Sequence, residues 1–223
     1  MSPDILIDLL KKIDTASLSD ALDSLGFSGG LLELHAQSSN DNICGQAFTV
    51  KYGDPTDEDK KLTRAADFID EVNSNEIIVL ANNGRIDCTV WGGILTNLAK
   101  SKNISGTVID GMCRDLNEIQ KLNYPVFSKG VFMQTGKGRT KKIAIQTDVY
   151  ICNVKISPGD YIRGDKNGVI VIPKELVEET IKRAQNIINT EKLILNSVLN
   201  GNRLDESRKK FRYDKPWNFN CDK

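Results

Sequence analysis

The order of helical and strand patterns is the feature that most constrains the fold of this chain. Up to residue 131, segments with apolar residues at helical spacing alternate with short runs rich in β-branched residues. Residues 141–173 then indicate several short strands, separated by turns such as Pro158-Gly159-Asp160. Residues 174–199 carry a long amphipathic helical pattern. This order predicts one α/β domain with a β-rich half and a long C-terminal helix.

Individual elements can be assigned from the same patterns. We expect the strand at 75–82 to be buried, because it is almost continuously apolar. The polar stretch after residue 200 predicts a second short helix followed by coil. Further helices are expected at 2–13, 14–27, 61–72, 94–103 and 114–123, and further strands at 29–34, 43–52, 104–111 and 124–132.

Composition excludes several classes of protein. Of the 223 residues, 39% are hydrophobic and 27% are charged, which is typical of a soluble globular domain. The net charge is zero, so the chain lacks the basic excess that most nucleic-acid-binding proteins carry. No apolar run reaches the roughly 18 residues of a membrane span, and the N-terminus lacks the basic region of a secretory signal. Five scattered cysteines favour reduced thiols and a cytoplasmic protein. The single histidine, His35, excludes a two-histidine metal site.

Two glycines stand before one of the expected helices, in Trp91-Gly92-Gly93. The first amides of a helix lack internal partners, and glycine lets a ligand approach them closely. The segment therefore predicts an anion site built from main-chain N–H groups. The alternative is that the glycines only allow the helix to pack tightly.

The segment "IDGMCRDLNE" places Arg114 and Asp115 just after a short apolar strand, which we expect over 107–110 with a sharp turn at Gly111. Arginine offers a planar fork for carboxylates, and aspartate is an oxygen ligand suited to Mg²⁺. Sites in α/β proteins lie at the carboxyl ends of strands, so both side chains are candidates for a ligand site. The alternative is an ordinary exposed ion pair.

The spacing of these residues resembles the motif of the RraA-like family. Gly93 is followed after twenty residues by Arg114-Asp115, and after two more by Glu118. Further similarity lies in the segments "TASLSDALDSLG", "CGQAFTV", "YPVFSKG" and "PGDYIRGDKNGVIVIP". The family includes 4-hydroxy-4-methyl-2-oxoglutarate aldolases with oxaloacetate decarboxylase activity, and a regulator of ribonuclease activity.

The resemblance implies a three-layer β/β/α sandwich, like a swivelling phosphohistidine domain, with a long C-terminal helix. It implies a single domain over residues 1–223, with a core at about 14–175 and the helix and tail at 174–223. It also implies a homotrimer or a dimer of trimers.

The resemblance further implies roles for individual residues. The amides of Gly92, Gly93, Ile94 and Leu95 would bind the carboxylate of a keto acid. Arg114 would hold the keto acid, and Asp115 would hold a divalent metal, Mg²⁺ or else Mn²⁺, partly through water. Glu191, on the C-terminal helix of a neighbouring subunit, would complete the catalytic set.

The function implied is a metal-dependent lyase that cleaves a small 4-hydroxy-2-oxo acid or oxaloacetate and releases pyruvate. A metal and Arg114 could together stabilise the charge that C–C cleavage leaves on the ketone oxygen. The sequence leaves the base open; a water on the metal, oriented by Glu191 or Asp110, is one possibility. The alternative functions are a non-catalytic regulator of a partner such as a ribonuclease, and an enzyme of the same fold with an unrelated substrate.

Two cationic segments lie outside the family motif. Residues 132–142 could form a flexible loop that binds a second acidic group of the substrate, or only a solvated connection between strands. The tail mixes cations with Phe211, Tyr213, Trp217 and Phe219. Such a tail could bind nucleic acid by stacking, but we favour packing on a neighbouring subunit.

Overall fold

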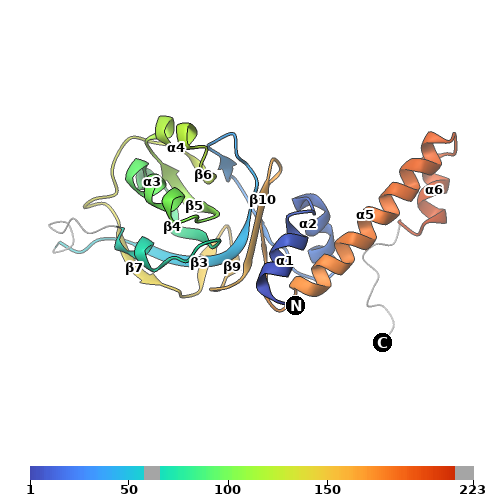
Figure 1. Cartoon of the computed structure of the whole chain (residues 1–223), viewed down its shortest axis with the longest axis horizontal. Helices are drawn as coiled ribbons and strands as arrows, with labels where there is room; N and C mark the ends of the chain where they lie inside the picture. The colour runs from blue at the N-terminus through green and yellow to red at the C-terminus, as the bar shows by residue number, and fades with distance from the viewer. Residues whose placement is uncertain (58–65, 214–223) are drawn as a thin grey trace.

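A bent mixed sheet forms the centre of the molecule. The computed structural model describes residues 1–57 and 66–213, and within them nine strands belong to this sheet (Figure 1). Its central part consists of four parallel strands in the order β3, β4, β5 and β6, with the two-residue β2 antiparallel at the edge. Their bounds are Ile43–Gly53 for β3, Ile77–Trp91 for β4, Gly106–Cys113 for β5, Val126–Val131 for β6 and His35–Ala36 for β2.

The sheet bends at β3. One edge of β3 pairs with β4, and its other edge is shared by two strands. The first half of β3 pairs with β10 (Tyr161–Asp165), and the second half pairs with β7 (Lys141–Ile145). From β10 the sheet continues through β11 (Gly168–Ile172) to β1 (Gly30–Leu31). A separate hairpin is formed by β8 (Val149–Ile151) and β9 (Val154–Ile156).

Both faces of the parallel strands are buried in the first part of each strand, which explains why these parts are mostly apolar. Ile78 and Ile109 face one cluster of buried residues, whereas their neighbours Val79 and Val108 face the other. The first cluster lies beneath α3 (Gly93–Ser101), α4 (Leu116–Leu122) and the short 3-10 helix η2 (Asp67–Glu71). The second cluster includes residues of β10, β11 and the β8–β9 hairpin. The predicted β/β/α layering is therefore confirmed, whereas the likeness to a swivelling phosphohistidine domain stays a prediction.

A further helical layer covers the outer face of β10 and β11. It consists of α1 (Pro3–Leu10), α2 (Thr15–Asp23) and the first half of α5 (Val177–Leu199), which pack on Tyr161 and Ile172. The start of α2 is fixed to β10, because both the amide and the hydroxyl of Thr15 donate to the Asp165 carboxylate at 2.7 Å.

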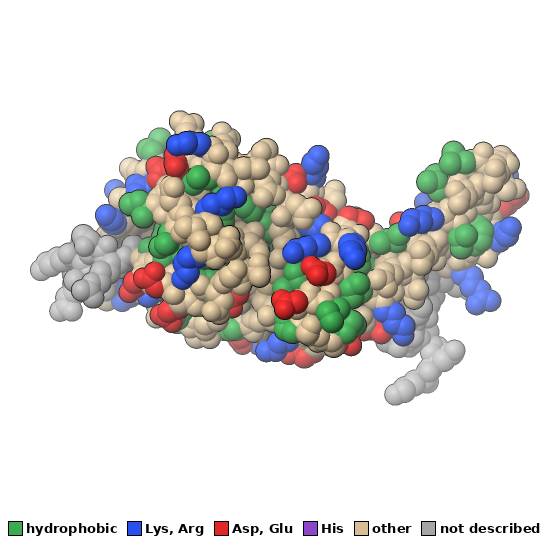
Figure 2. All heavy atoms as spheres, viewed as in Figure 1, with side chains coloured by type: hydrophobic (Ala, Val, Ile, Leu, Met, Phe, Trp, Pro, Cys, Tyr) green, Lys and Arg blue, Asp and Glu red, His purple; other side chains and the backbone are tan. Residues whose placement is uncertain are grey.

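The second half of α5 extends beyond the rest of the molecule, and α6 (Leu204–Lys210) folds back along it (Figure 1). The predicted long C-terminal helix and the short helix after it are confirmed. In the view of Figure 2, acidic and basic side chains are interspersed, in keeping with the zero net charge. None of the helices in the described ranges is long and apolar enough to cross a bilayer.

Some predictions differ from the structure or lie outside it. The strand expected at 75–82 continues as β4 to Trp91, and the strand expected to end at Asp110 continues as β5 to Cys113, so Gly111 lies within a strand and makes no turn. Of the helix expected at 61–72, the described part is η2; the remainder, like Trp217 and Phe219, falls outside the described residues.

Candidate active site

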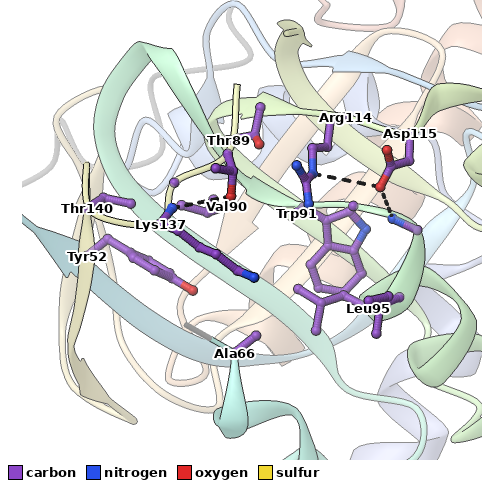
Figure 3. A pocket seen from close by; sticks show the side chains of 15 residues that line it. Tyr52, Ala66, Thr89, Val90, Trp91, Leu95, Arg114, Asp115, Lys137 and Thr140 are labelled. Carbon is purple, nitrogen blue, oxygen red and sulfur yellow. Dashed lines mark hydrogen bonds and ion pairs between the residues drawn. The ribbon is translucent and has the colours of Figure 1, made fainter. Parts of the chain in front are cut away.

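A pocket of about 300 Å³ lies at the carboxyl ends of β4 and β5 (Figure 3). One wall is formed by Trp91 and the first turn of α3, and a second by Arg114 and Asp115. The opposite side is formed by Tyr52, Thr89 and the segment 135–140. The structure thus brings together the two motifs that the sequence singled out, from Gly92 to Leu95 and at Arg114 and Asp115.

The first wall is fixed by hydrogen bonds around Gly92, which precedes α3. The Gly92 carbonyl accepts from the amide and the hydroxyl of Thr96, each at 3.0 Å. The Trp91 indole N–H donates to the same hydroxyl at 3.0 Å, and its ring stacks on Tyr124. The free amides at the start of α3 are therefore held on a rigid support.

Asp115 joins the second wall to the first. Its Oδ2 accepts from the Gly93 amide at 2.8 Å and lies 3.8 Å from Arg114 Nε. The backbone of Asp115 is left-handed, with φ +58°, and begins α4. Arg114 is held in turn by its own amide, which donates to the Trp91 carbonyl at 3.0 Å.

The approach of the two walls depends on the absence of a side chain at Gly92. A Cβ atom there would lie 2.7 Å from Asp115 Oδ2 and 3.2 Å from Arg114 Nε. The reason for this glycine is therefore its contact with the acid and the arginine. This supports the ligand-site interpretation of the glycine pair over close helix packing alone.

Arg114 and Asp115 remain accessible from the pocket, with 37% and 49% of their side chains exposed. Within the described ranges, no three acidic, histidine or cysteine side chains cluster as a ready-made metal site. A Mg²⁺ ion needs only one or two protein carboxylates and keeps several waters. Asp115 fits that requirement, because its exposed carboxylate is held in place through a single oxygen.

The opposite side of the pocket comes mainly from the segment 132–142. Thr135, Gly136, Lys137 and Thr140 line the pocket, and the Lys137 side chain extends across it (Figure 3). Burial raises the pKa of the Tyr52 phenol further above neutrality, so this side chain carries no charge in the pocket. The position of this segment favours the binding role over that of a simple connection, and its hydrogen bonds to β4 and to the Gly53 carbonyl fix it to the sheet, in contrast to the flexible loop of that alternative.

Two candidate residues lie away from the pocket within one chain. Asp110 points to another part of the structure, where its oxygens meet the Gly84 amide at 2.8 Å and Lys129 Nζ at 3.7 Å. Glu191 lies on α5, where it accepts from the Tyr213 hydroxyl at 2.7 Å, and this bond raises the Tyr213 pKa to about 12. Asp110 is therefore not placed to orient a water in the pocket, and Glu191 could reach a pocket only in a neighbouring subunit.

Sequence reasoning missed Tyr52 and Thr89, which also line the pocket. No motif marks them, because they are single polar residues in two different strands. The cationic glycine-bearing pattern of 132–142 was the one available signal for this side of the pocket.

Comparison of the sequence with known proteins shows similarity to one family and to several of its relatives. The sequence model of the RraA-like family, described as Aldolase/RraA, matches residues 15–171. The protein DlpA of Legionella pneumophila is 40% identical over 212 residues, 95% of this chain, but the chain spans only 34% of the length of DlpA. A putative 4-hydroxy-4-methyl-2-oxoglutarate aldolase of Halalkalibacterium halodurans is 32% identical over 181 residues, 80% of this chain and 81% of that protein.

Solved structures show the same fold. A crystal structure of an uncharacterized protein from Pseudomonas syringae superposes with a TM-score of 0.85 and 42% identity, over 93% of this chain and 94% of that one. RraAS2 of Streptomyces coelicolor, an unusual member of the RNase ES inhibitor RraA protein family, gives a TM-score of 0.76 at 22% identity. That alignment covers 84% of this chain and 94% of RraAS2, and it bears on the fold alone.

Proposed function

Because the chain belongs to the RraA-like family, we propose that it is a divalent-metal-dependent lyase. Its substrate would be a small 4-hydroxy-2-oxo acid or oxaloacetate, and its product pyruvate. The observation that carries the proposal is the arrangement of Asp115, whose carboxylate is held by the Gly93 amide beside Arg114.

The start of α3 would bind the carboxylate of the keto acid. The Gly93 amide already donates to Asp115, so within the segment 92–95 the substrate carboxylate would be bound chiefly by the amides of Ile94 and Leu95. These belong to the first turn of the helix, where N–H groups lack internal partners and the helix dipole favours an anion. Binding there would direct the ketone oxygen toward Arg114.

Arg114 would stabilise the negative charge that develops on the ketone oxygen as the C–C bond breaks. A fixed guanidinium is effective here because it needs no reorganisation during the reaction. Asp115 would hold the metal, and a bound Mg²⁺ or Mn²⁺ supplies Lewis-acid polarisation of the same oxygen. The proton of the substrate hydroxyl would be accepted by a water that Glu191 of the partner subunit orients.

The test is an assay of pyruvate release over a panel of 2-oxo acids, with and without Mg²⁺ or Mn²⁺. We expect release that depends on the metal, is lost in EDTA and is abolished in Asp115→Ala. Full activity of the metal-free protein would contradict the proposal. If no acid of the panel is cleaved, the regulatory function of the same fold becomes the better explanation.

A further inference from the structure

We propose that Tyr213 is a positioning residue for the active site of the neighbouring subunit, because its hydroxyl fixes the carboxylate of Glu191. This inference rests on the proposed function, in which Glu191 orients a water in a neighbour's pocket, and it adds a residue to that site. Among the described residues that line the pocket of one chain, Asp115 is the only acid. A second acid that assists proton removal therefore has to come from outside this pocket, so the conformation in which α5 presents Glu191 matters.

The contact between Tyr213 and Glu191 is a short hydrogen bond. The phenol hydroxyl donates to Glu191 Oε1 at 2.7 Å. In the described part of the chain, no other hydrogen bond or ion pair reaches this carboxylate. A carboxylate offers about four acceptor positions, so one bond leaves the second oxygen open to a water. Asp115 is held in a similar way, through Oδ2.

The end of α6 brings Tyr213 back to α5. The Arg212 amide donates to the Lys209 carbonyl at 3.2 Å, and the Tyr213 amide donates to the Arg208 carbonyl at 2.9 Å. Arg212 is left-handed, with φ +58°. Together these features form a Schellman motif, which ends a helix and redirects the chain. The Arg208 guanidinium lies over the Tyr213 ring, 5.8 Å from its centre, so backbone and ring are both held.

The helix α6, which folds back along α5 (Figure 1), contributes little apolar packing of its own. Ser207 is its only buried residue, and Leu204 is 47% exposed. Two side-chain hydrogen bonds join α5 to the segment 204–213. One links the hydroxyls of Ser207 and Ser197 at 2.8 Å, and the other engages Glu191. Only the second of these bonds can orient an acid.

A second carboxylate near Glu191 makes this hydroxyl important. Burial raises the pKa of Asp20 on α2, and the negative charge of Glu191 raises it further. Because like charges repel, a Glu191 side chain without a donor would turn away from Asp20 and take up several conformations. The Tyr213 hydroxyl offsets this repulsion and selects one conformation.

The expected consequence is an effect on turnover. A carboxylate that is oriented in advance assists proton transfer better than one that must reorient during the reaction. The 2-oxo acid itself would be bound by the start of α3 and by Arg114, in the subunit that contains the pocket. Loss of the Tyr213 hydroxyl should therefore lower kcat and leave KM nearly unchanged.

The experiment uses Tyr213→Phe, which removes the hydroxyl and keeps the ring beneath Arg208. Asp115→Ala and Glu191→Gln subunits are co-expressed, so that a working site combines Glu191 from the first with Asp115 from the second. Tyr213→Phe is then added to one kind of subunit or to the other. Pyruvate release from 4-hydroxy-2-oxoglutarate is measured with Mg²⁺ for the purified mixed oligomers. Ser207→Ala is the matched control, because it removes one hydroxyl from the same contact with α5.

We expect Tyr213→Phe in the Asp115→Ala subunits, which supply Glu191, to lower the recovered kcat about tenfold. This is the scale of one hydrogen bond to a charged group. The same change in the Glu191→Gln subunits should have no effect, and Ser207→Ala should have none in either kind of subunit.

The asymmetry between the two placements decides the outcome. Equal rates from both placements of Tyr213→Phe would overturn the role of Tyr213 alone, and so would an equal loss from Ser207→Ala, because the hydroxyl would then only attach α6 to α5. If the mixed oligomers without Tyr213→Phe release no pyruvate, the shared site of the proposed function fails as well.

Discussion

Asp115 has a left-handed backbone, with φ +58°, a conformation that is unfavourable for most non-glycine residues but that aspartate adopts more readily, because its side chain can form local hydrogen bonds. Its side chain explains why the conformation is tolerated. The bond from the Gly93 amide, at 2.8 Å, holds the carboxylate at the start of α3. The left-handed conformation thus occurs at the residue that we expect to hold the metal, as is common at functional sites.

Replacing Gly92 by alanine tests this contact directly. The added Cβ would lie 2.7 Å from Asp115 Oδ2, so the carboxylate and Arg114 must shift. We expect Gly92→Ala to lower pyruvate release at least a hundredfold, since small displacements in a site are costly. Gly30→Ala is the control, because a Cβ at Gly30 meets nothing within 4 Å. Equal activity of the two variants would contradict the proposed arrangement.

Replacing Arg114 by lysine separates charge from shape. Lysine keeps the positive charge but loses the planar fork, so Arg114→Lys should not restore function. The loss should fall on turnover as well as on binding and amount to about 2–4 kcal/mol, or a hundredfold or more. Steady-state kinetics beside a metal-affinity measurement checks this. Near-normal turnover with intact metal binding would make Arg114 only a structural partner of Asp115.

At the scale of elements, the sequence predicted the strands whose residues are apolar. It missed the second, polar half of β4, after residue 82. Residues 77–81 are apolar because both faces are buried, and this pattern can be recognised from the sequence alone. The continuation through "NNGRIDCTV" is polar, and its pairing with β5 is irregular after Ala81, so no period of two marks it as a strand.

Only part of the candidate site could be predicted from the sequence, because only some of its residues belong to a recognisable pattern. Gly92, Gly93, Arg114 and Asp115 lie in two compact motifs, and the structure brings them together. Thr89 is an isolated polar residue whose role depends on long-range pairing between β4 and the segment 132–140. Asp110 was misjudged because the strand predicted to end there continues, and its side chain contacts Lys129.

The attachment of α2 to β10 should make stability depend on pH. Burial tends to raise the Asp165 pKa, but the hydrogen bonds from Thr15 and from the Asn167 amide outweigh it and lower the pKa. A depressed carboxyl pKa stabilises the fold above the unfolded value of about 3.9, and this contribution is lost as pH falls through the folded value.

Thr15→Val removes one of these bonds and should lower the free energy of unfolding by about 1 kcal/mol at pH 6. This is less than a fully buried hydrogen bond to a charged group contributes, because the carboxylate is partly exposed. The difference from the wild type should shrink toward pH 3, as the pH falls below the unfolded pKa of about 3.9 toward the lowered pKa of the folded carboxyl. Urea unfolding at both pH values measures it. Thr190→Val is the control, because that hydroxyl bonds only a helix carbonyl and should show no pH dependence. A Thr15→Val effect that stays constant with pH would contradict this account.

At the scale of the whole molecule, the distance of α5 from the pocket predicts a shared site. If Glu191 acts in a neighbour, then Asp115→Ala and Glu191→Gln subunits can complement each other. Each variant alone should be inactive. Mixed oligomers that contain both kinds of subunit should recover about a third of wild-type activity as trimers, since one interface in three then has both residues, and about a quarter as dimers of trimers.

The measurement uses co-expressed subunits with two different tags, purified through both, with light scattering to confirm a trimer or a dimer of trimers. Each variant carrying both tags is the control. Inactive oligomers that contain both kinds of subunit would rule out a shared site, and a monomer at micromolar concentration would remove Glu191 from the site.

The two sides of the pocket come from separate stretches of the chain, so they can change independently of each other during evolution. The groups proposed for cleavage lie between residues 91 and 115, whereas the opposite side of the pocket comes mainly from the nine-residue loop 132–140. After a gene duplication, mutations confined to that loop can alter which acid is accepted while the inherited chemistry is kept. A lineage built on this plan can acquire new substrates in few steps, because fold and chemistry are not at risk in each one.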